Sequence, residues 1–207
     1  MSSKDQVAVA AAIGVVVLIA CLVLALDRIF PAPALPTPVQ NNHSVPVGWN
    51  GTQVQVIEFS DFECPFCRRG SQIIAELQQS YGPQIAVEFK HFPVHKDSQK
   101  AAEAAECARD QDMFWEYHDL LFSHQGSLGV EKLKRYAADL GLDAEAFALC
   151  LDSGSMASKV KADYQAGLSY GIQGTPTYFI NGRLIEGAQD IAVFMQVIDD
   201  ELGSTEP

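Results

Sequence analysis

The stretch "DFECPFCRRG" (Asp61–Gly70) contains two of the chain's five cysteines, Cys64 and Cys67, with a proline and a phenylalanine between them. Such a pair can bind a metal, form a structural staple or act as a redox centre. The preceding segment, "TQVQVIEFS" (Thr52–Ser60), alternates valines with polar residues before an apolar run, which predicts a strand entering a core. A helix is predicted directly after it, because Pro65 suits the first helical position, where no N–H is needed.

Metal binding is the least supported of the three interpretations. A tetrahedral zinc site needs four ligands, and a lone C-x-x-C supplies two. His91 and His95 are close in sequence, but Pro93 lies between them and breaks any helix that would place both on one face. Cys107 and Cys150 lie far along the chain. We therefore expect no metal ligand among these residues.

The redox interpretation follows from the position of the pair at the start of a helix. Unpaired N–H groups and the positive end of the helix dipole stabilise an anion there, so Cys64 is predicted to be an exposed, acidic thiol. Its pKa should fall from about 8.5 to between about 3.5 and 7.5. Cys67, one turn further along, is expected to be shielded and to attack a mixed disulfide on Cys64. Arg68 and Arg69 could favour the thiolate further, although arginines on a helix surface are usually only solvated.

The rest of the sequence predicts an α/β frame that is split by helices. "QIAVEFKHF" (Gln84–Phe92) is typical of a second strand. From about residue 99 to 167, apolar residues recur at spacings of three and four, which predicts an all-helical block. Strand signals return in "GTPTYFINGRLIEGA", where Asn181-Gly182 indicates a hairpin turn, and Ile191–Leu202 predicts a last helix. The predicted order is strand, helix, strand, helical block, hairpin and helix.

The N-terminal part of the chain differs from this frame. Val7–Leu26 is a run of 20 residues without a charge, and a helix of that length spans the core of a bilayer, about 30 Å. We expect a transmembrane anchor over 7–26, a short cytoplasmic tail over 1–6 and a proline-rich linker over 27–49. "LIAC", ending at Cys21, has the form of a bacterial lipoprotein cleavage box, but the apolar run continues beyond it, which argues against lipidation.

The charge of the chain argues against one class of partner. Fourteen basic and 26 acidic residues give a formal net charge of -12. Nucleic acids and anionic membrane surfaces are bound by basic faces. We therefore expect no nucleic-acid partner.

The motifs and their order resemble those of a known family. "VIEFSDFECPFC" and "GTPTYFINGRLIEGA" are similar to the motifs of the DsbA-like thiol:disulfide oxidoreductases, thioredoxin-fold proteins of the bacterial envelope with a helical domain inserted in the frame. The resemblance implies a thioredoxin-like α/β fold over 50–202, with an all-helical insertion at about 99–167, and leaves 203–207 as a tail. It also implies Cys64 as the attacking cysteine and Cys67 as the resolving one. The redox-active disulfide Cys64–Cys67 would be the only redox group, with no metal or organic cofactor.

The same resemblance implies where a substrate binds. Pro176 would be a cis-proline facing the cysteine pair, and the sharp turn would leave the backbone of Thr175 free to pair with an extended substrate. Pro65 and Phe66, beside Cys64, complete the expected substrate-binding residues.

Glu58 is a further candidate catalytic residue. It lies six residues before Cys64 on the predicted strand, and thioredoxin-like folds often carry an acid at the matching place. A buried carboxyl there could move protons to and from Cys67. The alternative is a glutamate in water at a strand edge, because alternation along a strand does not fix which face is buried.

Cys107 and Cys150 lie in the predicted helical block, each beside apolar residues. Two buried free thiols are one interpretation, because cysteine is often buried. In an oxidising compartment, however, two neighbouring thiols rarely stay reduced. We favour a structural disulfide that joins the first helix of the insertion to its last.

Together these features predict a membrane-anchored, monomeric oxidoreductase that introduces disulfides into exported proteins with cysteine thiols. A membrane redox partner would reset the pair. The protein is expected in the cell membrane, as a single-pass protein with its catalytic domain in the periplasm or cell exterior. Two alternatives remain, a disulfide isomerase or reductase on the same fold and a redox-inert, chaperone-like substrate-binding module.

Overall fold

The computed structural model of the chain describes residues 54–203. The predicted cytoplasmic tail (1–6), transmembrane anchor (7–26) and linker (27–49) lie outside the described residues, and so does the tail from residue 204 onward. Within the described part of the chain, no helix is both long and apolar enough to cross a bilayer. The three N-terminal assignments therefore stay predictions.

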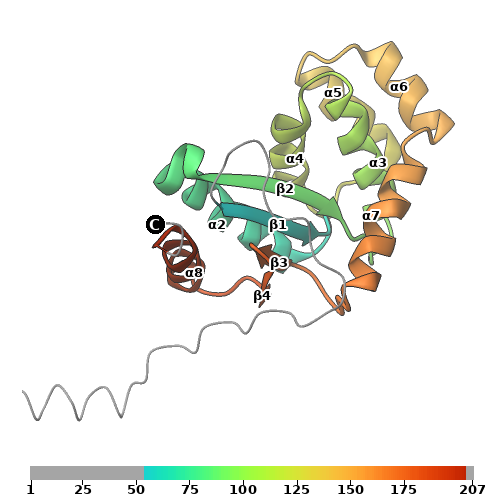
Figure 1. Cartoon of the computed structure of the whole chain (residues 1–207). Coiled ribbons are helices and arrows are strands. Elements are labelled where there is room, and N and C mark those ends of the chain that lie inside the picture. Colours follow the sequence, from blue (N-terminus) through green and yellow to red (C-terminus); the bar gives the residue numbers. More distant parts are fainter. Residues whose placement is uncertain (1–53, 204–207) are drawn as a thin grey trace, which may run out of the picture. The chain divides into compact units, whose positions relative to one another are not determined.

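A mixed sheet of four strands forms the centre of the fold (Figure 1). Its order is β2-β1-β3-β4, with the strands β1 (Val54–Ser60), β2 (Ile85–His91), β3 (Thr177–Ile180) and β4 (Arg183–Glu186). β1 pairs in parallel with β2 and antiparallel with β3. Every residue of β1 is buried. As the central strand is covered on both faces, its polar residues Gln55, Glu58 and Ser60 are buried as well.

Two helices cover one face of the sheet. α2 (Pro65–Tyr81) starts directly after the β1 turn, and a short 3-10 helix, η1 (Gly82–Gln84), joins it to β2. α8 (Ile191–Gly203) lies beside α2, and both bury their apolar side chains against β1 and β3. α2 thus carries the C-x-x-C motif from the end of the central strand, as predicted.

A run of five helices between β2 and β3 forms the insertion. These are α3 (Ser98–Arg109), α4 (Phe114–Ser123), α5 (Val130–Asp139), α6 (Ala144–Ser153) and α7 (Ala157–Ser169). The predicted helical block is confirmed, with bounds of 98–169 in place of 99–167. α3 is rich in alanine, and its buried small side chains allow the other helices to pack closely around it. α7 covers the second face of the sheet, where Gly167 lies so close to Phe92 that a Cβ atom would come within 2.6 Å of the ring.

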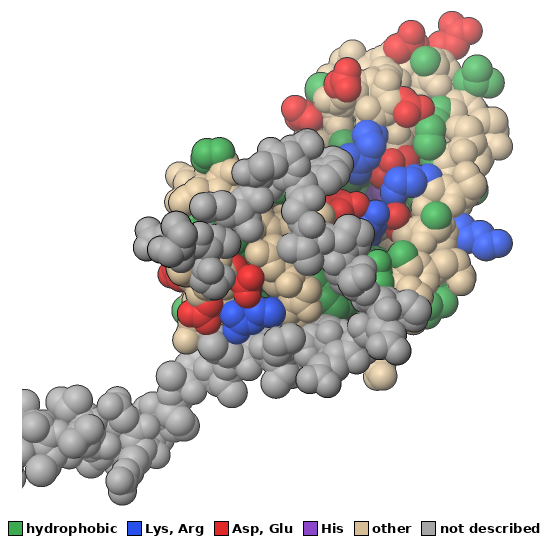
Figure 2. All heavy atoms as spheres, in the orientation of Figure 1, with side chains coloured by type: hydrophobic (Ala, Val, Ile, Leu, Met, Phe, Trp, Pro, Cys, Tyr) green, Lys and Arg blue, Asp and Glu red, His purple; other side chains and the backbone are tan. Residues whose placement is uncertain are grey.

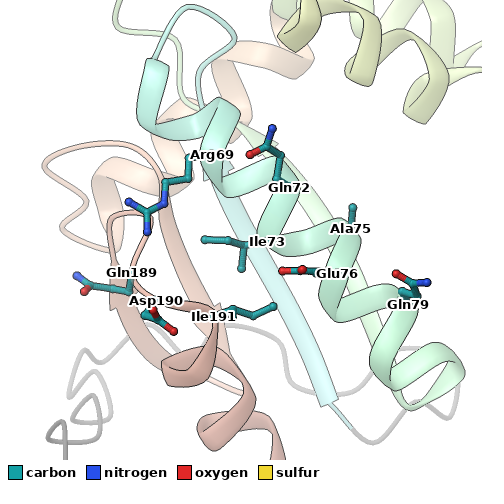
Figure 3. A pocket seen from close by; sticks show the side chains of 9 residues that line it. All are labelled: Arg69, Gln72, Ile73, Ala75, Glu76, Gln79, Gln189, Asp190 and Ile191. Atoms are coloured by element: carbon teal, nitrogen blue, oxygen red, sulfur yellow. The ribbon is translucent and has the colours of Figure 1, made fainter.

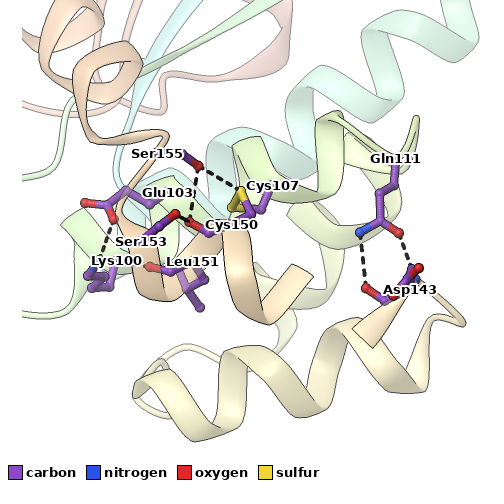
Figure 4. The surroundings of a disulfide bond; sticks show 9 residues. All are labelled: Lys100, Glu103, Cys107, Gln111, Asp143, Cys150, Leu151, Ser153 and Ser155. Atoms are coloured by element: carbon purple, nitrogen blue, oxygen red, sulfur yellow. Dashed lines mark hydrogen bonds and ion pairs between the residues drawn. A yellow bond between two sulfur atoms is a disulfide. The ribbon is translucent and has the colours of Figure 1, made fainter. Parts of the chain in front are cut away.

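Cys107 and Cys150 form a disulfide in the structure (Figure 4). It joins α3 to α6, with Cα atoms 5.9 Å apart. The expectation that it would reach the last helix of the insertion is wrong, because α7 follows α6 and packs on the sheet. Nearby, Lys100 of α3 binds the Leu151 carbonyl oxygen of α6 at 3.3 Å. The disulfide therefore reinforces a contact that the side chains also make.

The predicted hairpin is also present. Asn181 and Gly182 connect β3 to β4 with φ values of 45° and 84°, the left-handed backbone that a tight hairpin turn requires. Figure 2 shows acidic side chains gathered at the outer end of the insertion, with lysines and arginines between them and the sheet.

Candidate active site

Cys64 is the residue directly before α2, where β1 has ended. Its backbone N–H donates to the carbonyl oxygen of Asp61 at 3.1 Å, and its own carbonyl accepts from Cys67 and Arg68 of the first helical turn. The thiol of Cys64 lies 3.4 Å from the carbonyl oxygen of Thr175. Only 6% of Cys64 is exposed, so the prediction of an exposed thiol is wrong. The loop before β3 lies over the start of α2 and partly covers it.

The two thiols differ strongly in acidity. The pKa of Cys64 is lowered to about 5, first because the Cys67 thiol donates to it, and further by the backbone N–H groups of Cys67 and Phe66. These N–H groups belong to the helix start, as the sequence predicted. Burial raises the pKa of Cys67 far above its ordinary value, and Cys67 is fully buried. At neutral pH the pair is therefore a thiolate at Cys64 beside a thiol at Cys67.

The predicted substrate-binding residues lie around the thiolate. The peptide bond between Thr175 and Pro176 is cis. Phe66 is 63% exposed and Pro65 is exposed beside it, so the C-x-x-C turn presents apolar surface to solvent. The carbonyl of Thr175 contacts Cys64. The loop before β3 thus brings Thr175 and Pro176 next to Pro65 and Phe66.

Glu58 is completely buried, which excludes the strand-edge alternative. Burial raises the pKa of its carboxyl to about 7, although the hydroxyls of Ser60 and Tyr178 oppose the rise. A carboxyl with this pKa can both give and accept a proton near neutral pH. The sequence named Glu58 but could not fix the face of the strand on which it lies.

Asp61 was missed as a site residue. One carboxylate oxygen accepts from Val94 N at 2.6 Å, His95 N at 3.1 Å and His95 Nδ1 at 2.9 Å, and the other accepts from the Ser98 hydroxyl. The backbone N–H of Asp61 lies 3.4 Å from Cys67 Sγ. Asp61 therefore ties the loop after β2 to the cysteine pair. Its only sequence signal is its place just before the motif.

Gln125 was missed as well. It lies in the loop between α4 and α5, and its side-chain nitrogen donates to the carbonyl oxygens of Phe62 at 2.9 Å and Cys64 at 2.8 Å. The helical insertion thus holds the backbone of the C-x-x-C turn. No pattern in the sequence indicates this contact, because it joins residues 61 positions apart.

Two grooves border α2. The larger, of about 540 Å³, lies between α2 and the start of α8 (Figure 3) and is lined by Arg69, Gln72, Ile73, Ala75, Glu76, Gln79, Gln189, Asp190 and Ile191. The smaller, of about 280 Å³, lies towards α4 and includes Arg68 and Phe122. Arg68 and Arg69 are both exposed and face these grooves. Among the residues described, no three His, Cys, Asp or Glu side chains are grouped as metal ligands.

Comparison with known proteins places the chain in a family. A family model described as thioredoxin matches residues 40–200. Curated relatives include the Na(+)/H(+) antiporter NhaA of Herminiimonas arsenicoxydans, 34% identical over 152 residues, and NhaA 3 of Salinispora tropica, 38% identical over 160 residues. These matches cover 73% and 76% of this chain but 24% of each relative. The chain thus spans about a quarter of the length of the curated relatives it matches.

Solved structures show the same fold. BdbD from Bacillus subtilis in its oxidised form matches with a TM-score of 0.69 and 27% identity, over 83% of this chain and 100% of that one. The thiol-disulfide exchange protein alpha-DsbA2 from Wolbachia pipientis matches with a TM-score of 0.66 and 22% identity, over 86% and 92% of the two chains. The resemblance drawn from the motifs is confirmed. The chain belongs to the thioredoxin family and has the fold of the DsbA-like thiol:disulfide oxidoreductases.

Proposed function

We propose that the protein is a thiol:disulfide oxidoreductase that introduces disulfides into exported proteins through Cys64 and Cys67. The observation that carries the proposal is the difference between the two thiols. Cys64 has a pKa of about 5, whereas burial keeps Cys67 protonated. A thiolate is the nucleophile in disulfide exchange, and an acidic thiol is also the better leaving group. Exchange with a client therefore proceeds at Cys64.

In the oxidising direction, a client thiolate attacks Cys64 of the enzyme disulfide. The Cys64–Cys67 bond breaks, a client–Cys64 disulfide forms, and Cys67 leaves with the bonding electron pair and takes up a proton. A second client thiolate then attacks the client sulfur of this mixed disulfide. The client disulfide forms and Cys64 leaves as a thiolate. The client loses two electrons and the cysteine pair gains them.

The acidity of Cys64 also favours this direction of electron flow. Stabilising the thiolate stabilises the reduced pair, so the disulfide becomes a stronger oxidant. No metal or organic cofactor is required, because the disulfide itself accepts both electrons. After each turnover, a membrane redox partner would take these electrons and restore the disulfide.

The client is proposed to bind across the exposed turn. Its backbone would pair with Thr175 next to Pro176, by the strand-addition geometry of extended peptides. Pro65 and Phe66 would contact its apolar side chains, since 63% of Phe66 is open to solvent.

The proposed enzyme is a monomer that residues 7–26 anchor in the cell membrane, with its catalytic domain in the periplasm or cell exterior. The uncharged run of 20 residues supports the anchor. The Cys107–Cys150 disulfide supports the compartment, because such bonds persist where the environment is oxidising.

The test is turnover of a reduced client that contains two cysteines. The oxidised protein should form the client disulfide, and Cys64→Ala should abolish the reaction. Cys67→Ala cannot form the enzyme disulfide and should also leave this client reduced. With an oxidised client, however, its Cys64 thiolate should open the client disulfide and accumulate as a mixed disulfide, because Cys67 is not there to resolve it. A redox-inert binding module would give no product with any of these proteins. An isomerase would rearrange a scrambled client but leave the dithiol client reduced.

A further inference from the structure

A cluster of buried polar side chains lies beneath Cys67. Glu58 and Ser60 are two residues apart on β1 and so point to the same face of the sheet. Tyr178 on β3 is the cross-strand partner of Glu58. The exposed fractions of the three residues are 0%, 2% and 0%. This face is the one that α2 covers, directly behind the cysteine pair.

A glycine in α2 makes room for the tyrosine hydroxyl. A Cβ atom on Gly70 would lie 2.1 Å from Tyr178 Oη, and no real side chain tolerates that distance. Glycine inside a helix costs about 1 kcal/mol relative to alanine. The Tyr178 hydroxyl therefore lies against the α2 backbone at Gly70. An alanine there would favour the helix but would leave no space for the hydroxyl.

The Ser60 hydroxyl interacts with both Glu58 and Cys67. Ser60 directly precedes Asp61, whose backbone N–H lies 3.4 Å from Cys67 Sγ. The Ser60 hydroxyl counteracts the effect of burial on the pKa of Glu58 and also on that of Cys67. The charges of Glu58, Cys67 and Cys64 all act on Tyr178. The other neighbours are His91 on β2, the buried cross-strand partner of Ser60, whose Nε2 bonds Glu106 at 2.7 Å, and two phenylalanines. Phe89 on β2 lies beside Glu58, and Phe194 on α8 lies against the Tyr178 ring.

These polar atoms are close enough to interact, but they do not form fixed hydrogen bonds with one another. Both carboxylate oxygens of Glu58, Ser60 Oγ and Tyr178 Oη lack a contact with full hydrogen-bond geometry among the described residues. Buried polar atoms without a full hydrogen bond are rare, because each costs free energy. A group of them beside a reactive thiol is the arrangement expected where protons move during a reaction.

We propose that the Ser60 hydroxyl carries the proton between Glu58 and Cys67, and that Tyr178, admitted by Gly70, is a positioning residue for the Glu58 carboxyl. The proposal rests on the exchange reaction proposed above. When Cys67 leaves as a thiolate, Ser60 donates its proton to the sulfur and takes one from the Glu58 carboxylic acid, which becomes a carboxylate. When the Cys67 thiol attacks a mixed disulfide on Cys64, the same proton returns along this path to Glu58. A hydroxyl can do both, because it donates and accepts.

The attack of Cys67 can be followed by loading Cys64 of the full chain with glutathione and measuring glutathione release against pH by acid quench and mass spectrometry. In the wild type, release should rise with a midpoint near the pKa of Glu58, about 7, as the carboxylate becomes able to accept the proton. Ser60→Ala should slow release about 100-fold, the usual size of a lost proton-transfer group. In Ser60→Ala, and likewise in Glu58→Gln, the rate of release should no longer show this midpoint against pH. The double variant should be no slower than either single variant.

Tyr178→Phe keeps the ring and removes only the hydroxyl. The Glu58 midpoint should rise by about one pH unit, because a hydrogen-bonding group that favours the carboxylate is lost. Gly70→Ala should shift it in the same direction by displacing the hydroxyl. The matched controls are Ser80→Ala, an exposed serine in the last turns of α2, and Tyr164→Phe, a tyrosine of α7 that stacks on Phe92. Both should leave the rate and the midpoint unchanged.

The Glu58 carboxyl can also be titrated directly by ¹³C NMR of the protein without any client. This measurement tests the positioning role of Tyr178 separately from the proposed exchange reaction, because the titration needs no exchange activity. An upward shift in Tyr178→Phe supports the positioning role even if the client reaction fails. An unchanged Glu58 midpoint in Tyr178→Phe, or wild-type release in Ser60→Ala, would overturn the inference.

Discussion

The side-chain nitrogen of Gln125 lies 2.8 Å from the carbonyl oxygen of Cys64 and donates a hydrogen bond to it. A second bond reaches the Phe62 carbonyl, so one side chain of the insertion holds both sides of the turn that presents the reactive cysteine. The donor end of an amide is positive, which also favours a nearby anion. The helical insertion therefore contributes to the geometry of the active site as well as to the core.

Gln125→Ala should destabilise the protein by about 1–3 kcal/mol, the cost of leaving the Phe62 carbonyl without this donor. It should also raise the pKa of Cys64, which thiolate absorbance near 240 nm reports. Gln111→Ala is the matched control, because Gln111 makes two hydrogen bonds to Asp143 within the insertion, far along the chain from the cysteine pair. It should lower stability without moving the Cys64 titration. An unchanged Cys64 pKa in Gln125→Ala would contradict the role of this contact.

When protonated, His95 places a positive charge near the thiolate. The bond to Asp61 is the first cause that raises the pKa of His95, and the negative charge of Cys64 also contributes. By the same interaction, the protonated imidazole stabilises the Cys64 thiolate. His95→Gln should therefore raise the pKa of Cys64 slightly. The shift should shrink in 1 M salt, because His95 is half exposed and surface charges are screened. A shift that is independent of salt would argue for a structural cause instead.

Glu106 should make stability depend on pH in the acid range. Burial disfavours its charged form, but bonds from His91 at 2.7 Å and Arg109 at 2.9 Å outweigh this and lower the pKa to about 2. The carboxylate therefore contributes stability above its unfolded pKa of about 4.3, and the contribution is lost as the pH falls through about 2.

Glu106→Gln should be less stable than the wild type at pH 7, and the difference should narrow as the pH is lowered from about 4.3 towards 2. Urea denaturation at a series of pH values measures this. Glu116→Gln, an exposed residue on α4, is the control and should follow the wild type throughout. If the difference in unfolding free energy between Glu106→Gln and the wild type stays constant down to pH 2, folding does not lower the pKa of Glu106.

The disulfide between Cys107 and Cys150 should stabilise the fold without taking part in exchange. Its sequence separation of 43 residues corresponds to roughly 4 kcal/mol of lost unfolded-state entropy. Cys107→Ser with Cys150→Ser should lower the urea midpoint accordingly and leave client oxidation at Cys64 unchanged. During mild reduction, the Cys64–Cys67 bond should open first. Loss of client turnover at unchanged stability would place this disulfide in the redox path instead.

Local patterns predicted the frame and the reactive pair because each signal lies within a few residues. Pro65 defines the start of α2, Asn181 and Gly182 define the hairpin, and the order of these elements around a helical block indicated the thioredoxin-like fold. The acidity of Cys64 also followed from its place at a helix start.

Other features depend on segments that meet only in three dimensions. The low exposure of Cys64 arises from the loop at Thr175, which lies more than a hundred positions along the chain. Gln125 reaches the motif from a loop with no sequence signal of its own. His95 was considered only as a zinc ligand, whereas its partner is the carboxylate of Asp61. The face of β1 that buries Glu58 became clear only from the strands and helices around it.

The redox potential of the Cys64–Cys67 pair tests the oxidase function most directly. The purified protein is equilibrated with defined ratios of reduced and oxidised glutathione, the thiols are trapped with acid and alkylated, and the reduced fraction is counted by mass spectrometry. Because Cys64 is held as a thiolate, the pair should be half reduced at a potential less negative than about -200 mV, in the range of oxidising members of this fold. A potential near or below about -270 mV, which is typical of reducing thioredoxins, would contradict the proposal that this protein donates disulfides.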